Sequence, residues 1–301
     1  MIPPLAEIVE IPTAVTLVSG KDARMHLDRM LTVDVSKDSF LTRRYSLICD
    51  LNGRITSYQL HADLGGQILL FHDHSVSNIL RDNLTRGIPW NENIEISSGD
   101  GAVHRILLYG KHPERVILGL GINIEELHGE KWTEFLDSMI SVIHTKGDFS
   151  LYEMLVPARN YSAFVQSLKN NGAEEGERNS AIALQSLSGR IDTSVGVSGN
   201  IPFNLGLDDL IDLKKGCYPG QEIHARMESR DRINKTTSAF KTQREMPLGR
   251  MKSTENSPIE IISSQQLGDS WINLIVHPNE IELDSEISVL TSDGEISAHR
   301  V

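Results

Sequence analysis

Cysteine is scarce in this sequence of 301 residues, which contains only Cys49 and Cys217. Two thiols cannot build a disulfide framework or a four-thiolate metal site, and this scarcity fits the reducing cytoplasm. Long apolar runs are also missing, since none approaches the ~20 residues that a membrane-spanning helix needs. The first residues lack the basic and apolar regions of a signal peptide. We therefore expect a cytoplasmic protein with no membrane partner.

Positive charge is in the minority. The sequence has 29 Lys and Arg residues against 41 Asp and Glu residues, a formal net charge of −12, and no long basic run. This balance argues against general nucleic-acid binding, although it leaves room for a local basic pocket. A hydrophobic fraction of 39% is typical of a globular protein, and the length favours two or three packed units over one core.

Several familiar motifs are absent as well. The sequence has no H-E-x-x-H, no C-x-x-C, no Walker sequence and no G-x-S-x-G. His72 and His74 could share one face of a strand, but no third ligand is near, so we interpret them as ordinary polar residues. The sequence therefore predicts no resident metal.

The spacing of apolar residues predicts a mixture of helices and strands. Asn52-Gly53 is a strong hairpin signal between strands at 45–50 and 54–63. The other expected elements are helices at 21–31, 75–84, 160–173 and 180–192, strands at 67–72, 149–157 and 210–215, helix or turn segments at 114–121 and 130–140, and a solvated connector at 174–179. After Thr236 short β-rich runs separated by turn residues indicate a small all-β unit.

Cys217 lies in the segment "DLKKGCYPGQEIHAR". Pro219-Gly220 suits the two central positions of a type II turn, and a helix is expected from Gly220 onward. A helix N-terminus and the neighbouring Lys214 and Lys215 would favour the reactive thiolate. A small residue filling a turn explains the same pattern, so both interpretations stay open on physical grounds. Cys49, in an apolar strand, reads as a small buried hydrophobe.

The same segment resembles the signature of the YgfZ family of folate-binding proteins, relatives of the glycine-cleavage T-protein (aminomethyltransferase). The family pattern K-G-C-(Y/F)-x-G-Q-E-x-x-A-R is matched at Lys215, Gly216, Cys217, Tyr218, Gly220, Gln221, Glu222, Ala225 and Arg226. "VSGKDARMHLDRMLTVDVS", "YSLICDLNGRI", "LYEMLVPARNYSAFVQSLKNNGA" and "SGRID" resemble further T-protein segments. The resemblance covers residues 18–235.

This resemblance implies an α+β fold with two mixed α/β subdomains in residues 1–236 and a β-barrel in 237–301, arranged as a cloverleaf ring. It also implies tetrahydrofolate in a central channel. The implied role is the assembly or repair of iron–sulfur clusters, including those of tRNA-modifying enzymes. The expected partners are folate and iron–sulfur client or assembly proteins, and we expect a monomer.

The resemblance also implies the site residues. Cys217 and Lys215 are the expected reactive groups, with Cys217 as a possible transient metal ligand. The expected folate-binding residues are Tyr45, Arg190, Asp192, Tyr218, Gln221, Glu222 and Arg226. Asp192, which replaces the glutamate of the T-protein R-x-E, could accept hydrogen bonds from a pterin. Arg226, Arg230 or Arg232 could form a cationic mouth for the glutamate tail, although this charged cluster also fits a solvated helix end.

Two departures from the T-protein bear on activity. Thr56 and Ser57 occupy the positions of its acidic pair, and hydroxyls cannot act as carboxylate bases. The T-protein also lacks the K-G-C-Y loop. A binding protein is therefore expected rather than an enzyme, while a folate-dependent aminomethyltransferase or demethylase stays as the alternative. A third possibility is that Lys215 and Cys217 are structural.

Overall fold

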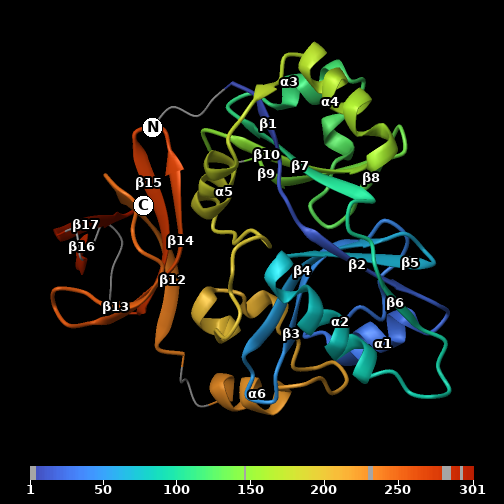
Figure 1. The fold of residues 1–301 in the computed structure, drawn as a ribbon, viewed down its shortest axis with the longest axis horizontal. Coiled ribbons are helices and arrows are strands. Elements are labelled where there is room, and N and C mark those ends of the chain that lie inside the picture. The colour runs from blue at the N-terminus through green and yellow to red at the C-terminus, as the bar shows by residue number, and fades with distance from the viewer. Residues whose placement is uncertain (1–4, 146, 230–232, 280–285, 292–293) are drawn as a thin grey trace.

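The computed structural model describes residues 5–145, 147–229, 233–279, 286–291 and 294–301. Two mixed α/β units and a barrel surround a central segment, residues 188–220, which runs between α5 and α6 (Figure 1). Within the described residues no helix is both long enough and apolar enough to cross a membrane.

The first unit is built on an antiparallel sheet in the order β3-β4-β5-β2-β6. Its strands are β2 (Ala14–Ser19), β3 (Arg43–Cys49), β4 (Ile55–Asp63), β5 (Gln67–His72) and β6 (Glu95–Ser98), and its helices are α1 (Ala23–Met30) and α2 (Ser77–Arg86). Leu27 of α1 and Leu80 and Leu84 of α2 are fully buried in a core shared with Ile48 and Leu70 of the sheet. The apolar positions of the two helices thus hold them on one face of the sheet.

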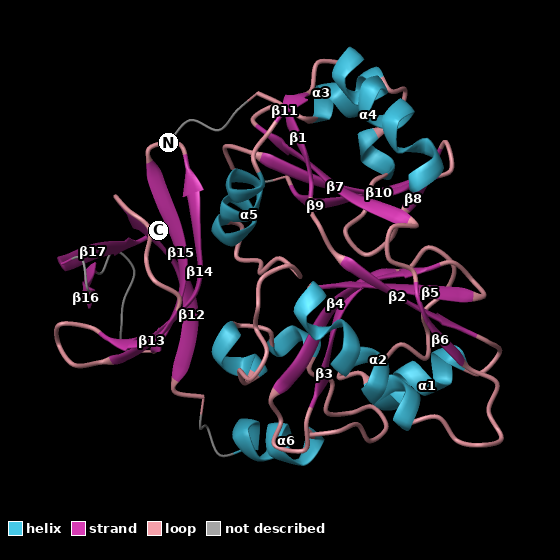
Figure 2. Ribbon diagram, in the orientation of Figure 1, coloured by secondary structure: helices cyan, strands magenta, loops and turns pink. Residues whose placement is uncertain are grey.

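The second unit contains the sheet β11-β1-β7-β10-β9-β8. Its strands are β1 (Glu7–Glu10), β7 (Val103–Gly110), β8 (Thr133–Phe135), β9 (Ser138–His144), β10 (Ser150–Pro157) and β11 (Glu174–Glu175), and its helices are α3 (Glu114–Gly119), α4 (Tyr161–Asn170) and α5 (Arg178–Leu187). Figure 2 shows α3 and α4 on the outer side of this sheet and α5 between the sheet and the barrel. Helix α5 therefore links the second unit to the third.

The third unit is a nearly closed barrel in the order β13-β14-β15-β12-β17-β16. Its strands are β12 (Lys235–Thr242), β13 (Gly249–Lys252), β14 (Pro258–Leu267), β15 (Ser270–Pro278), β16 (Glu286–Thr291) and β17 (Gly294–Arg300). A bridge between Ser253 and Val289 brings the two ends of the sheet together. The expected C-terminal β unit is confirmed.

Two local predictions were wrong. Residues 130–140 form the β8–β9 hairpin, with Leu136 and Asp137 in the left-handed region at its tip. Residues 210–215 are not a strand, because the Asp212 carboxylate accepts hydrogen bonds from the backbone N–H groups of Lys214 and Lys215. The backbone is thus satisfied locally instead of in a ladder. The connector at 174–179 is largely exposed, as expected, and its first two residues form β11, which pairs in parallel with β1.

The loop that contains Cys217 docks on the tip of the β3–β4 hairpin. The type II turn is confirmed: Gly220 has φ +85, and the Gln221 N–H donates to the Tyr218 carbonyl at 3.2 Å. Helix α6 (Gln221–Ser229) follows, and the buried His224 places Nε2 2.9 Å from the Gly53 carbonyl oxygen. The signature loop and the hairpin therefore form one packed unit.

Gly220→Ala should loosen this docking. A Cβ at Gly220 would lie 2.6 Å from the Asp50 carbonyl oxygen, in a left-handed conformation that disfavours alanine. We expect a loss of about 2 kcal/mol or more in the free energy of unfolding, measured by urea denaturation.

Gly216→Ala in the same loop is the matched control, since a Cβ there meets nothing within 4 Å. Equal stability of the two variants would contradict the docking.

Candidate functional site

The Lys215 side chain binds the carboxyl end of helix α1. Its side chain is 1% exposed, and the ammonium donates to the carbonyl oxygens of Asp28, Leu31 (3.0 Å) and Val33 (2.7 Å) and lies 3.1 Å from the Asp28 carboxylate. Burial lowers the pKa of Lys215, and Asp28 opposes that effect. A cation at the carboxyl end of a helix is electrostatically favourable. Lys215, a predicted reactive group, therefore holds its loop against α1 in this structure.

The rest of the signature divides between the protein interior and solvent. Tyr218 is buried, with its hydroxyl 3.4 Å from His224 Nδ1, and the Gln221 side chain donates to the Lys215 carbonyl at 3.4 Å. Glu222 and Arg226 are exposed on α6 and pair with each other one turn apart. The tyrosine and the glutamine therefore hold the loop together.

Cys217 is exposed between these anchored residues. Cys49, by contrast, is buried at the end of β3, and burial raises its pKa to about 12. Among the described residues, no three His, Cys, Asp or Glu side chains are grouped as a metal site would require. The chain's one exposed thiol thus lies on a loop that is fixed at both ends.

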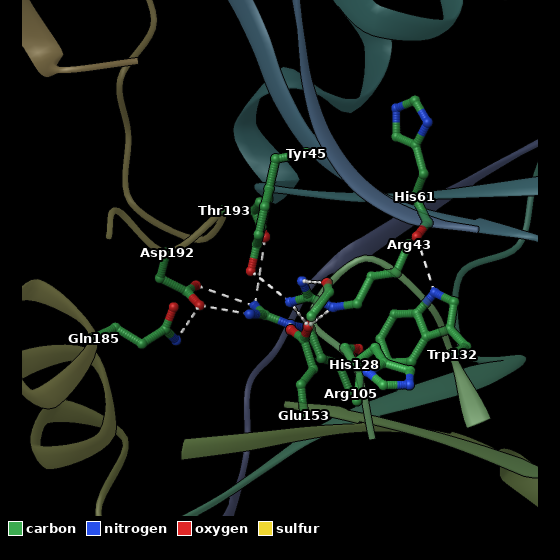
Figure 3. Close-up of polar contacts among 12 residues, drawn as sticks. Arg43, Tyr45, His61, Arg105, His128, Trp132, Glu153, Gln185, Asp192 and Thr193 are labelled. Carbon is green, nitrogen blue, oxygen red and sulfur yellow. Dashed lines mark hydrogen bonds and ion pairs between the residues drawn. The ribbon is translucent and has the colours of Figure 1, made fainter. Parts of the chain in front are cut away.

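A row of buried charges lies where the two α/β units meet (Figure 3). The Arg105 guanidinium on β7 donates through Nε to Glu153 of β10 and through Nη1 and Nη2 to the Asp192 carboxylate, at 3.1 and 2.6 Å. All three side chains are fully buried. The Gln185 amide (2.7 Å) and the Ser194 N–H (2.8 Å) complete the surroundings of Asp192.

Arg43 extends this row to the other sheet. It lies on β3 and donates hydrogen bonds to the Glu153 carboxylate and, at 2.9 Å, to the Tyr45 hydroxyl. Its guanidinium also stacks over Trp132, 5.3 Å from the ring centroid. Burial alone would raise the pKa values of Glu153 and Asp192, but Arg105 and, for Glu153, Arg43 outweigh it and hold both below their usual values. The carboxylates are therefore charged at neutral pH.

An open cavity of about 210 Å³ lies beside this row, and we call it the aromatic cavity. Its lining combines a buried floor with a polar rim: Tyr45, Tyr58, Ser188, Gly189, Arg190, Ile191, Gly206, Leu207, Asp209 and Leu210. The rings of Tyr45 and Tyr58 are 5.7 Å apart and tilted by 31°. Arg190 and Asp209 are exposed at the rim.

A larger cavity of about 520 Å³ lies on the barrel side of the central segment. It shares Gly206 with the aromatic cavity and is lined by the cations Lys235 and Arg300 and the acids Asp208 and Glu228. Arg226 is not among its lining residues, and Arg230 and Arg232 lie outside the described residues. Among the described residues, α6 contributes Glu228 to this cavity and not Arg226.

The predicted site residues thus separate into two places. Tyr45 and Arg190 line the aromatic cavity, and Asp192 lies behind it in the charged row. The other six residues belong to the signature loop, and Cys217 lines neither cavity.

Sequence reasoning missed Arg43, Arg105, Glu153, Tyr58 and Asp209. Glu153 did carry a signal, since one charge inside the apolar run "SLYEMLVP" predicts a buried ion pair. Arg105, inside the strand "VHRILLYG", carried the same signal. Nothing in the sequence marks Tyr58 or Asp209 as facing a shared cavity.

Glu153→Gln should destabilise the fold strongly, because it leaves Arg43 and Arg105 with too little compensating charge. We expect a loss of about 3–5 kcal/mol in the free energy of unfolding at pH 7. The exposed pair gives the matched control: Glu222→Gln should cost about 0.5 kcal/mol or less.

Because Glu153 and Asp192 have depressed pKa values, their stabilisation is present above about pH 4 and is lost as the pH falls further. Urea titrations between pH 7 and 3 should show a shallower acid loss in Glu153→Gln, and an equal loss would contradict the role of the row.

Comparisons with known proteins identify solved structures that resemble this one. No family model and no curated protein matches the sequence. Among solved structures, glycine cleavage system aminomethyltransferase T from Bartonella henselae matches with a TM-score of 0.78 and 15% identity, over 98% of this chain and 84% of that chain. Heterotetrameric sarcosine oxidase from Corynebacterium sp. U-96 matches with a TM-score of 0.36 and 11% identity, over 57% and 88%. The chain has the fold of aminomethyltransferase T, as the sequence resemblance implied.

Proposed function

We propose that this protein binds tetrahydrofolate and, like proteins of the YgfZ type, supports the assembly or repair of iron–sulfur clusters, including those of tRNA-modifying enzymes. The observation that carries the proposal is the aromatic cavity, which lies between strands β3 and β4 and the central segment of an aminomethyltransferase T fold. The exposed cysteine of the signature loop adds the second part of the function.

The residues of the cavity suit a folate. A flat pterin fits a floor made of Tyr45 and Tyr58, and the apolar Ile191 and Leu207 suit its faces. Drug-sized ligands usually occupy about 300–1,000 Å³, so a cavity of about 210 Å³ would take the pterin alone. The rest of the molecule would pass Gly206 into the larger cavity, where Lys235 and Arg300 suit an anionic glutamate tail.

The exposed thiol suits contact with a second protein. One cysteine cannot hold an iron–sulfur cluster alone, since such clusters are held by several protein ligands. Cys217 would therefore act on a cluster that a client or assembly protein also holds. Its exposure on a fixed loop, outside both cavities, supports this division between a folate site and a partner site.

The alternative, a folate-dependent aminomethyltransferase or demethylase, has less support. The Thr56 hydroxyl donates to the Ile48 carbonyl at 3.0 Å, and the buried Ser57 hydroxyl donates to the Gln59 side chain at 2.9 Å. Neither hydroxyl lines the aromatic cavity. A transferase would need a general acid or base at the reacting nitrogen. Turnover of methylamine donors with tetrahydrofolate, independent of Cys217, would favour it.

Calorimetric titration of the pure protein with tetrahydrofolate tests the first part. We expect one site per chain, and Tyr58→Leu should weaken binding about tenfold because it removes ring stacking. Tyr161→Leu on α4 is the matched control, since that tyrosine is partly exposed and lies outside both cavities. Failure of the wild-type protein to bind any reduced folate would overturn the proposal.

Complementation tests the second part. In cells that lack the protein and have lost iron–sulfur enzyme activity, Cys217→Ser should fold normally, because the residue is exposed, but should not restore that activity. Cys49→Ala, which removes the buried thiol, is the control and should restore it. Full rescue by Cys217→Ser would rule out a role for the thiol.

A further inference from the structure

We propose that Asp209 and Arg190, and not Asp192, read the hydrogen-bonding edge of the ligand's ring and select a 2-amino-4-oxo pterin over its 4-amino counterpart. This inference rests on the proposed folate site and assigns the specificity within it.

Asp192 has no free acceptor for this task. Its two oxygens take both Nη groups of Arg105, the Gln185 amide and the Ser194 N–H, and the residue is 1% exposed. A ligand could reach it only by breaking the charged row. A buried carboxylate that is already paired in this way gains little from an added donor and loses much if its partner leaves.

Asp209 and Arg190 are placed where a ring edge would arrive. Arg190 lies just after α5 and Asp209 in the short helix Asp208–Leu210, and both line the aromatic cavity together with the two tyrosines. Among the described residues neither takes part in an ion pair with any partner, including each other. Opposite charges thus share one small opening.

The electrostatics of Asp209 support the assignment. Partial burial at the rim raises the pKa of Asp209 and the neighbouring Asp208 adds to the rise, while Arg190 and backbone hydrogen bonds from Asp209 and Leu210 act in the opposite direction. A carboxylate with too little compensating charge gains from a ligand that brings N–H donors. The same ligand should offer an acceptor to Arg190, because a guanidinium has donors only.

A 2-amino-4-oxo ring meets both needs. Its 2-amino group and N3–H present two donors that a carboxylate can accept side by side, and its 4-oxo group presents an acceptor to the guanidinium. A 4-amino ring turns that acceptor into a donor and removes the N3 hydrogen. It would therefore place a hydrogen-bond donor opposite the donors of Arg190 and offer Asp209 one donor fewer.

The experiment compares tetrahydrofolate with tetrahydroaminopterin, its 4-amino counterpart, by calorimetric titration. The wild-type protein should bind the 4-oxo compound about tenfold or more tightly. Arg190→Met should remove most of this preference, and Asp209→Asn should weaken tetrahydrofolate binding about tenfold. Asp269→Asn, the same change at an exposed turn of the barrel, should leave both affinities unchanged.

The outcomes separate the two proposals. If the wild-type protein binds neither compound, the folate site itself is wrong. If it binds tetrahydrofolate but Asp209→Asn binds it equally well, or if the wild-type protein shows no preference between the rings, the assignment to Asp209 and Arg190 is overturned. Melting temperatures of the variants show whether they are folded, and the wild-type preference needs no variant at all.

Discussion

The ion pairs of Arg105 hold the centre of this molecule together. One guanidinium on β7 joins Glu153, in the neighbouring strand, to Asp192, in the central segment, with all three groups out of water. Charges this deeply buried are tolerated only when every partner is present. Arg43 then carries the same arrangement to β3 of the other sheet. The two α/β units and the segment between them are thus fixed by one continuous set of charges.

The aromatic cavity depends on this arrangement. Arg43 donates to the Tyr45 hydroxyl, and Asp192 anchors the stretch that carries Arg190 and Ile191 along the rim. The charged row therefore positions the floor and one side of the cavity without lining it. Asp192, which the sequence marks as a ligand-binding candidate, is paired within the charged row and supports the segment beside the cavity.

The sequence predicted the general fold, and two of its candidate residues, Tyr45 and Arg190, line the aromatic cavity. Alternating apolar residues and Asn52-Gly53 were enough for the β3–β4 hairpin, and Pro219-Gly220 for the turn at the signature loop, because local chemistry decides both. The prediction of a strand at 210–215 was wrong because the Asp212 side chain accepts hydrogen bonds from the backbone N–H groups that a strand would use. Which residues share a cavity could not be predicted, since Tyr58 and Asp209 line the same cavity only because distant segments of the chain pack together.

The Lys215 contacts bear on how the loop could meet a partner. Lys215 ties one end of the loop to α1, and Gly220 with His224 ties the other end to the hairpin tip. Folding has then already removed most of the conformational freedom around Cys217. A partner that reaches the thiol would lose little entropy by ordering this loop, so even a small contact area could give useful affinity and fast release.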